Sequence, residues 1–448
     1  MSFKVVGLSG ADPFGVLYTD GQRFLRGIRE EGADIIRLLF EKGIFQDLSN
    51  RGLMANTIIL DKEKIPPALS GFSMVLEHDP ITPLSYPREW SFEMVKDIAL
   101  SFLESASILK SSGFTFKDSH LFNWGFHGTR PVWLDITSII PMDKSNLTQP
   151  WQKQFWLGVY APLVMWSKSM PMLASKSIAN PAQNLSAEEC LAVLNLGFGI
   201  NIPIIGKLIK KIWVLLLSSW ASKRRKVERL KCTNYSTWGN YHDEFFDKNG
   251  KILLNSRFEM ILELLNKYEP TSVVELAGNA GVMSEAIAKR FSNITVHCTD
   301  YDSTAIDCFF RRVRKHGPVN LSMAVLDFMV SEYSSAEITP DKRFRSDCVL
   351  ALAVTHHLLL TQGYSYEQIF NVIGKYSSRL VFIEFMPLGL HDGHHAPEIP
   401  NWYNQENFEN EFKKIFKLTR VEKLDENRVL FIGEKLDVQN NHISKNIL

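Results

Sequence analysis

Acidic side chains occur where two β-rich runs end, on either side of a tight turn of small residues. The run from Thr271 to Asp302 reads TSVVELAGNAGVMSEAIAKRFSNITVHCTDYD, and its apolar strand reaches Glu275 just before the turn at 277–281. Small residues let the backbone approach a ligand closely. An acid roughly 20 residues beyond such a turn is where nucleotide-binding folds hold ribose hydroxyls. Asp300 occupies that position, so the spacing predicts a pocket for a nucleotide-type ligand.

Alternating strands and helices surround this run and must position its acids. The sequence predicts strands over 272–276, 294–298, 321–326, 348–354 and 380–385, helices over 303–315 and 366–376, and a final antiparallel hairpin over 416–423 and 428–433. This alternation predicts an α/β domain with a doubly wound, mainly parallel sheet. Its ligand is expected beyond the carboxyl ends of the strands.

The first 145 residues have a different pattern, with short strand-like runs and two longer helical ones, which predicts an α+β domain. In this part Asp118 and Asn123 form a D-x-x-x-x-N arrangement, and Asp135 closes a later short strand. The arrangement partly resembles the catalytic and metal-binding loops of kinase-like folds. The alternative is that the three side chains hydrogen-bond the turns of a structural β-hairpin.

A helical, aromatic-rich segment follows and ends in a basic run. The apolar stretch 212–217 is far shorter than the roughly 20 residues that a membrane-spanning helix needs. Residues 207–231 fit a packed helix with a solvated basic linker, which we favour, or an interfacial helix drawn to anionic lipid headgroups. We therefore expect an N-terminal domain over 1–145, a helical extension with its linker over 146–230, and the α/β domain over 231–448.

Composition excludes several classes of protein. The 448 residues include 45% hydrophobic ones, enough to bury two cores, and the net charge is +1, which does not favour nucleic acid as a partner. Five widely spaced cysteines suit free thiols in a reducing compartment. The N-terminus lacks the apolar core of a signal peptide, so we expect a cytoplasmic protein.

The motifs of about residues 235 to 435 resemble those of a known family. In chain order, ELAGNAG, TDYD, LDF, DCVLALAVTHHL and LVFIEFMP are similar to the successive motifs of class I S-adenosylmethionine-dependent methyltransferases, which have a Rossmann-like sheet and a terminal hairpin. More narrowly, the chain resembles a bacterial family of two-part methyltransferases that includes nodulation-type proteins. The stretch KDxxxxN...PVxxDxxS, from Lys117 to Ser138, carries the narrower resemblance.

The resemblance implies an S-adenosylmethionine pocket with assigned roles. Glu275 lies beside the methionine moiety, and the turn approaches its carboxylate and ribose. Asp300 takes both ribose hydroxyls, with Asp302 as its substitute, while Asp327 and Phe328 meet the adenine. The turn residues implied at the cofactor are Ala277, Gly278, Asn279 and Gly281. Two of them, Ala277 and Asn279, replace glycines of the family pattern. Asn accepts a positive φ, and Ala tolerates close approach, so the turn can still form.

Candidates for proton transfer stand at later strand ends. His356, His357 and Glu384 are the predicted catalytic residues, since a neutral histidine can remove a proton from a hydroxyl group. Adjacent residues at a strand end project oppositely, so only one of the two histidines is expected to face the cleft. The loop HDGHH, with His391, Asp392, His394 and His395, lacks a matched zinc pattern and is expected to be solvated, and we predict no metal site.

These observations predict a methyltransferase that uses S-adenosylmethionine, acting on oxygen of a small or carbohydrate-like acceptor. Two other hypotheses remain open. The first half can be a kinase-like module that presents the acceptor to an enzymatic second half. Alternatively, the cofactor site has decayed and the protein is a scaffold.

Overall fold

The computed structural model describes residues 3–6, 12–143, 145, 149–179, 220–232, 236, 245–246, 252–330, 337–391 and 397–436. The chain forms two compact units. The first comprises Met1–Ser236 with the short segments Val313–Lys315 and Ser334–Glu337, and the second comprises Thr237–Arg312, His316–Tyr333 and Ile338–Leu448. Each unit is described by itself.

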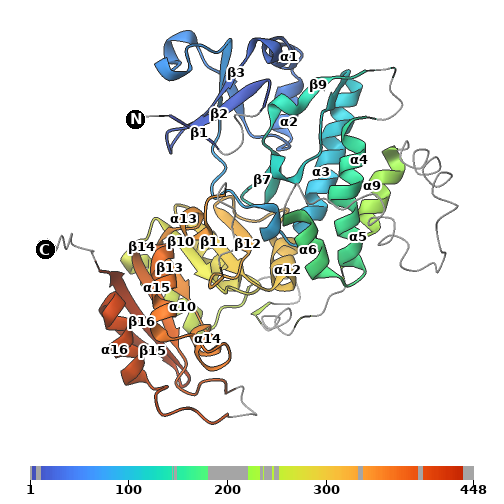
Figure 1. Ribbon diagram of the computed structural model, residues 1–448. Helices are drawn as coiled ribbons and strands as arrows, with labels where there is room; N and C mark the ends of the chain where they lie inside the picture. Colours follow the sequence, from blue (N-terminus) through green and yellow to red (C-terminus); the bar gives the residue numbers. More distant parts are fainter. Residues whose placement is uncertain are drawn as a thin grey trace, which may run out of the picture. The chain divides into compact units, whose positions relative to one another are not determined.

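The first unit begins with an antiparallel sheet in the order β1-β2-β3-β5-β4 (Figure 1). Its strands are β1 (Lys4–Val5), β2 (Gly15–Thr19), β3 (Phe24–Ile28), β4 (Thr57–Ile59) and β5 (Met74–His78), with α1 (Glu30–Glu41) and α2 (Ile44–Asn50) inserted between β3 and β4. Two small antiparallel sheets follow the long helix α3 (Phe92–Ser111). One pairs β6 (Phe114–Phe116) with β9 (Ile139–Pro141), and the other is the hairpin of β7 (Trp124–His127) and β8 (Arg130–Trp133). The predicted α+β character of this part is confirmed.

Aromatic rings around α3 form the core of the first unit. Phe102 lies 4.9 Å from Phe116, 5.8 Å from Trp133 and 5.0 Å from Trp151, measured between ring centroids. Trp151 begins a run of helices, α4 (Trp151–Phe155), a π-helical segment (Trp156–Tyr160), α5 (Ala161–Ser167) and α6 (Pro171–Ala179). Rings of this size bury large apolar areas, so they fix the two small sheets against α3.

The basic segment is only partly within the described residues. Positions 207–219 lie outside them, and α9 (Trp220–Arg229) carries the rest of the run. Lys223 is fully buried with its Nζ 5.2 Å from the ring of Trp151, so this lysine is not available to a lipid surface. Among the helices that the structure describes, none is long and apolar enough to span a membrane.

The second unit contains a seven-stranded sheet in the order β12-β11-β10-β13-β14-β16-β15 (Figure 1). Its strands are β10 (Ser272–Leu276), β11 (Thr295–Asp300), β12 (Leu321–Val325), β13 (Ser346–Ala351), β14 (Ser377–Phe385), β15 (Phe416–Asp425) and β16 (Arg428–Lys435). The first five run parallel, and the final hairpin pairs antiparallel through β16 to β14. The predicted doubly wound sheet and terminal hairpin are therefore present.

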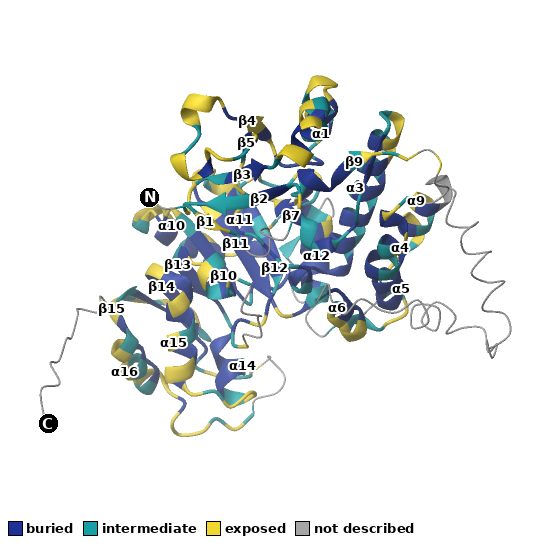
Figure 2. Cartoon of the chain, turned by 45° about the horizontal axis from the view of Figure 1, so that its top comes forward, coloured by how far each residue is buried: buried dark blue, intermediate teal, exposed yellow. Residues whose placement is uncertain are grey.

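Helices cover both faces of this sheet because side chains alternate along its strands. On one face Val274, Val349 and Val381 pack with α15 (Tyr366–Tyr376) and α16 (Gln405–Ile415) in one buried cluster. On the other face lie α10 (Ser256–Tyr268) and α11 (Val282–Arg290), whose side chains reach β14 and β10. The remaining helices of the second unit are α12 (Ser303–Val313), α13 (Pro340–Arg343) and α14 (Thr355–Leu360). The strands thus appear buried between helices in Figure 2.

Phe408 anchors the aromatic part of the second core, and we expect its truncation to be costly. Its fully buried ring lies 4.8 Å from Phe385, 4.8 Å from Phe431 and 5.1 Å from Phe370. Phe408→Ala should lower the free energy of unfolding by about 3–5 kcal/mol, because a cavity replaces these contacts. Val421→Ala, at a 38% exposed position of β15, should change the free energy of unfolding by no more than about 0.5 kcal/mol. Urea titrations followed by circular dichroism compare the two variants. Equal midpoints would contradict the central place of Phe408 in this core.

Candidate functional site

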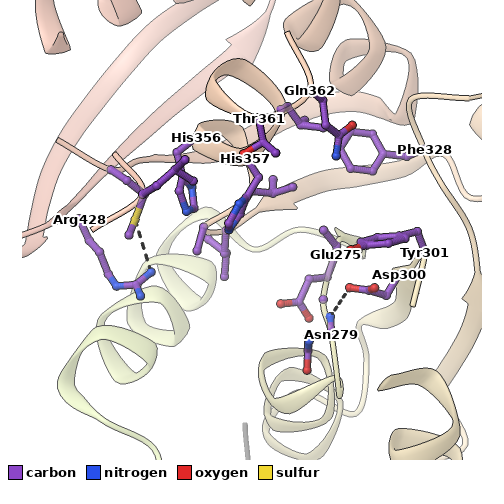
Figure 3. Close-up of a pocket in the computed structure, with 18 of the residues that line it drawn as sticks. Glu275, Asn279, Asp300, Tyr301, Phe328, His356, His357, Thr361, Gln362 and Arg428 are labelled. Atoms are coloured by element: carbon purple, nitrogen blue, oxygen red, sulfur yellow. Dashed lines mark hydrogen bonds between the residues drawn. The ribbon is translucent and has the colours of Figure 1, made fainter. Parts of the chain in front are cut away.

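A cavity of about 720 Å³ lies at the carboxyl ends of the parallel strands in the second unit. Figure 3 shows residues from several strand ends and from α14 around it. This volume is within the usual range for pockets that hold a small molecule. The location agrees with the rule that open α/β sheets bind ligands beyond these strand ends. Of the predicted site residues, those that line the cavity are Glu275, Ala277, Gly278, Asn279, Asp300, Asp327, Phe328, His356 and His357.

The turn after β10 takes the left-handed conformation despite its missing glycines. Ala277 has φ of 55° and Asn279 has φ of 50°, both in the region that favours glycine. The two retained glycines have steric reasons: a Cβ at Gly278 would lie 2.7 Å from Cys298 Sγ, and one at Gly281 would lie 2.3 Å from the ring of Phe309. Glycine is therefore present at the two positions where a Cβ would collide with a neighbour. At Ala277 and Asn279, where the backbone only needs a positive φ, other residues occur.

Asp300 closes β11 and fixes the turn from the side. Its Oδ2 accepts a hydrogen bond from the backbone N–H of Asn279 at 2.7 Å, and its Oδ1 accepts one from the N–H of Asp302 at 2.8 Å. Burial raises the pKa of Asp300 to about 6, since a buried carboxylate loses its hydration. Asp302 is also buried and caps the next turn through the N–H of Thr304, and it does not line the cavity.

Glu275 ties β10 to the helix that follows the turn. Its Oε2 accepts the Ser284 N–H at 3.0 Å and a short hydrogen bond from the Ser284 hydroxyl. Burial raises the pKa of Glu275 to about 7, although the hydrogen bonds from Ser284 and the charge of Arg257 oppose that shift. Glu275 is thus the carboxyl group most easily kept protonated near neutral pH in this cavity.

The end of β12 supplies an acid and a ring at the cavity wall. Asp327 is exposed and accepts the Met329 N–H at 3.0 Å, while Phe328 is 8% exposed. Tyr301, which the sequence analysis missed, also lines the cavity and is 58% exposed, next to Asp300 in Figure 3. Tyr301 could have been found from the sequence because it directly follows Asp300, the acid predicted to bind ribose hydroxyls. Two aromatic rings at the same wall can flank a planar base.

The histidine pair differs from the prediction. The strand ends at Ala351, and both histidines lie on the short helix α14 rather than at a strand end. His356 and His357 both line the cavity, with ring centroids 4.1 Å apart, so the expectation that only one faces it is wrong. Consecutive helical residues are separated by about 100°, which lets both reach one cavity.

Both imidazoles are neutral at pH 7. Burial, with smaller contributions from the charges of His357 and Arg428, lowers the pKa of His356 to about 3. Burial also lowers the pKa of His357. The Nδ1 atom of His356 is buried and has no hydrogen-bond partner among the residues that the structure describes. Such an atom costs free energy unless a ligand or water reaches it.

Glu384 is an ion-pair partner rather than a group open to the cavity. Its side chain is fully buried, and Arg257 donates to it twice, from Nε to Oε1 at 2.8 Å and from Nη2 to Oε2 at 2.9 Å. Arg428 Nη1 donates to Oε2 at 3.0 Å. The carboxylate is thus fully engaged and does not line the cavity, so geometry gives no support to its predicted catalytic role. The two arginines, which the sequence analysis missed, do line it.

The predicted histidine-rich loop is described only at its start. His391 is exposed and lines the cavity, whereas Asp392, His394 and His395 lie outside the described residues.

In the first unit, the D-x-x-x-x-N residues hydrogen-bond local turns. Asn123 donates to Asp118 Oδ1 at 2.8 Å, and Asp135 accepts the Thr137 N–H at 3.2 Å. Arg26 on β3 pairs with Asp135 at 3.1 Å. These contacts fit the structural alternative, in which the polar side chains stabilise the turns between the hairpins.

No family model matches the chain. Nodulation protein NoeA of Rhizobium meliloti (strain 1021) is 22% identical over 415 residues, which span 84% of this chain and 83% of that protein. Five parallel strands completed by the terminal hairpin form the sheet that the methyltransferase resemblance implied. The second unit has the class I methyltransferase fold.

The chain as a whole is a distant homologue of NoeA. Two solved structures are also similar to it: magnesium protoporphyrin IX methyltransferase from Synechocystis with bound SAM (11% identity, TM-score 0.30, 46% of this chain and 100% of that one) and N-methyltransferase NodS from Bradyrhizobium japonicum (16%, 0.29, 41% and 99%). Because these TM-scores are low, the fold is assigned from the strand order of this chain and not from the similarity to solved structures. None of the comparisons supports the kinase-like interpretation of the first unit.

The turn predicts a contrast between two glycines. Gly281→Ala should destabilise the second unit by about 2–4 kcal/mol, because a positive φ of 66° and a collision with Phe309 act together. Gly363→Ala is the matched control, since its φ of 74° is similar but no atom of the described residues, its chain neighbours aside, lies within 4 Å of the added Cβ. It should cost only about 1 kcal/mol. Chemical denaturation measures both, and equal losses would show that the packing at Gly281 is not tight.

The raised pKa of Glu275 predicts a pH dependence of stability. Its folded pKa of about 7 exceeds the unfolded value of 4.5. The folded state therefore binds more protons, and stability is lost as pH rises from about 4.5 through 7. Glu275→Gln, which cannot ionise, should reduce the fall in unfolding free energy between pH 5 and pH 8 by roughly 1–3 kcal/mol. If the unfolding free energies of wild type and variant change equally with pH, the raised pKa of Glu275 is contradicted.

Proposed function

We propose that the protein is an S-adenosylmethionine-dependent methyltransferase that acts on a small acceptor. The supporting observation is Asp300, a carboxylate at the end of β11 that lines the cavity and is held by the backbone N–H groups of Asn279 and Asp302. A carboxylate oxygen has more than one acceptor site, so each oxygen can still accept a ribose hydroxyl. The fold of the second unit and the position of the acid after the turn point to the same ligand.

The described residues fit such a cofactor. Gly278 lines the cavity and has no side chain of its own, so the backbone can be approached closely there. Tyr301 and Phe328 can flank the adenine, and Asp327 can accept its exocyclic amine. Arg257 lines the same cavity and its charge acts on Glu275, so it can pair with the methionine carboxylate. When bound, S-adenosylmethionine supplies an activated methyl group on a sulfonium.

The chain's own part in the transfer is to orient the acceptor and hold its proton. For a hydroxyl acceptor, a neutral imidazole can accept the proton as the oxygen forms its new bond. His357 is the better candidate, because charging His356 is opposed by its burial and by the nearby charge of Arg428. Thr361 and Gln362 add polar groups to the same part of the wall (Figure 3). These features favour oxygen of a small or carbohydrate-like acceptor.

Calorimetric titration of S-adenosylmethionine tests the proposal. Wild-type protein should bind S-adenosylmethionine. Asp300→Ala should weaken that binding by about 3 kcal/mol, roughly a hundredfold in Kd, because the two charge-assisted hydrogen bonds from the ribose hydroxyls are lost. Affinity should also rise from pH 5 to pH 7, as Asp300, with its pKa of about 6, becomes ionised. Glu367→Gln, on the exposed surface of α15, is the control and should bind as wild type does. Lack of binding by the wild type would disprove the proposed function.

A further inference from the structure

Two guanidinium groups converge on one buried carboxylate beside the cavity. Arg257 and Arg428 both pair with Glu384, which is completely buried, while the two arginine side chains are 9% and 18% exposed. This cluster carries two positive charges and one negative charge. Arg428 Nε also lies 3.3 Å from Asp425, but that carboxylate is 47% exposed and is screened by water. Among the described residues, the two guanidiniums thus share one fully buried carboxylate, and Arg428 has a second, exposed one.

The carboxylates that line the cavity lie together at the ends of neighbouring parallel strands. The acids among the lining residues are Glu275, Asp300 and Asp327, which belong to the ends of β10, β11 and β12. Arg428 begins β16, and in Figure 3 it lies near His356 on the opposite side from Asp300. No lining residue at the Arg428 end is a carboxylate, among the residues that the structure describes.

The two arginines meet at Glu384 Oε2 but have different further neighbours. Arg257 acts on Glu275, beside the turn, whereas Arg428 acts on His356 in α14. Arg428 Nη1 also lies 3.6 Å from Met386 Sδ, another lining atom, which keeps its guanidinium at the cavity wall (Figure 3). Arg428 is thus the cation next to the histidine pair.

We propose that the acceptor carries an anionic group, a carboxylate or a phosphate, which Arg428 binds next to His356 and His357. This inference rests on the proposed function, because it assigns the Arg428 end of the cavity to the acceptor and the Asp300 end to the cofactor. A guanidinium matches the geometry of both oxyanions. The buried Nδ1 of His356 gains a polar neighbour at the same time.

Binding of small anions to protein saturated with S-adenosylhomocysteine tests this assignment. Inorganic phosphate and acetate are titrated separately by calorimetry at constant ionic strength. Arg428→Gln should weaken anion binding by about tenfold or more, and Arg428→Lys, which keeps the charge, should lose less. Lys423→Gln removes an exposed cation of β15 and should leave anion binding unchanged. All three variants should bind S-adenosylhomocysteine within about twofold of wild type, and thermal unfolding confirms that each is folded.

The outcomes separate this inference from the proposed function. Equal anion affinity in wild type and Arg428→Gln would overturn the acceptor assignment, as would competition between the anion and S-adenosylhomocysteine, which would place the anion at the cofactor's carboxylate. If Arg428→Gln does not fold, Arg428→Lys and Lys423→Gln still compare a changed cavity cation with a changed surface cation. Absence of S-adenosylhomocysteine binding with Arg428-dependent phosphate binding would disprove the proposed cofactor while retaining the anion site.

Discussion

Carboxylates that satisfy backbone N–H groups hold the centre of the second unit together. A tight turn presents several N–H groups in one direction, and these must find acceptors when they are buried. Glu275 accepts from the first turn of α11, and Asp300 accepts from the turn itself. The three pieces, β10, β11 and α11, are therefore linked by the same side chains that face the cavity. Removing either acid would disturb the local backbone as well as any ligand.

This constraint explains how a glycine-poor turn survives. Ala277 and Asn279 have positive φ values that cost roughly 1–2 kcal/mol for a residue with a Cβ. The hydrogen bond from Asn279 N–H to Asp300 is short and charge-assisted, which offsets part of that cost. Asn279 adds a side-chain bond to the N–H of Ala280 at 2.7 Å. The turn is thus held by polar contacts as well as by the small size of its residues.

Much of the second unit could be predicted from sequence, because local periodicity determines it. The helix over Tyr366–Tyr376 and the strand over Ser272–Leu276 occur at the predicted positions. The acids at strand ends also follow from sequence, since parallel strands bring their carboxyl ends to one edge. The histidine pair was misplaced because a short helix after a strand has too few residues to show its period.

The contacts around Glu384 could not be predicted in the same way. They join α10, β14 and β16, which are far apart in the chain, and depend on the register of the terminal hairpin. A sequence shows an acid at a strand end but not which cations will meet it. The same limit applies to Arg26 and Asp135 in the first unit, whose pairing spans 109 positions.

The separation of Asp300 from Arg428 gives the cavity an internal electric dipole. Charges of one sign in a low-dielectric cleft concentrate the field there, and two opposed groups direct it from end to end. A ligand with charges at both of its ends would be turned by this field before it makes any hydrogen bond. The cavity can thus select the direction in which a molecule enters, independently of the shape of its walls.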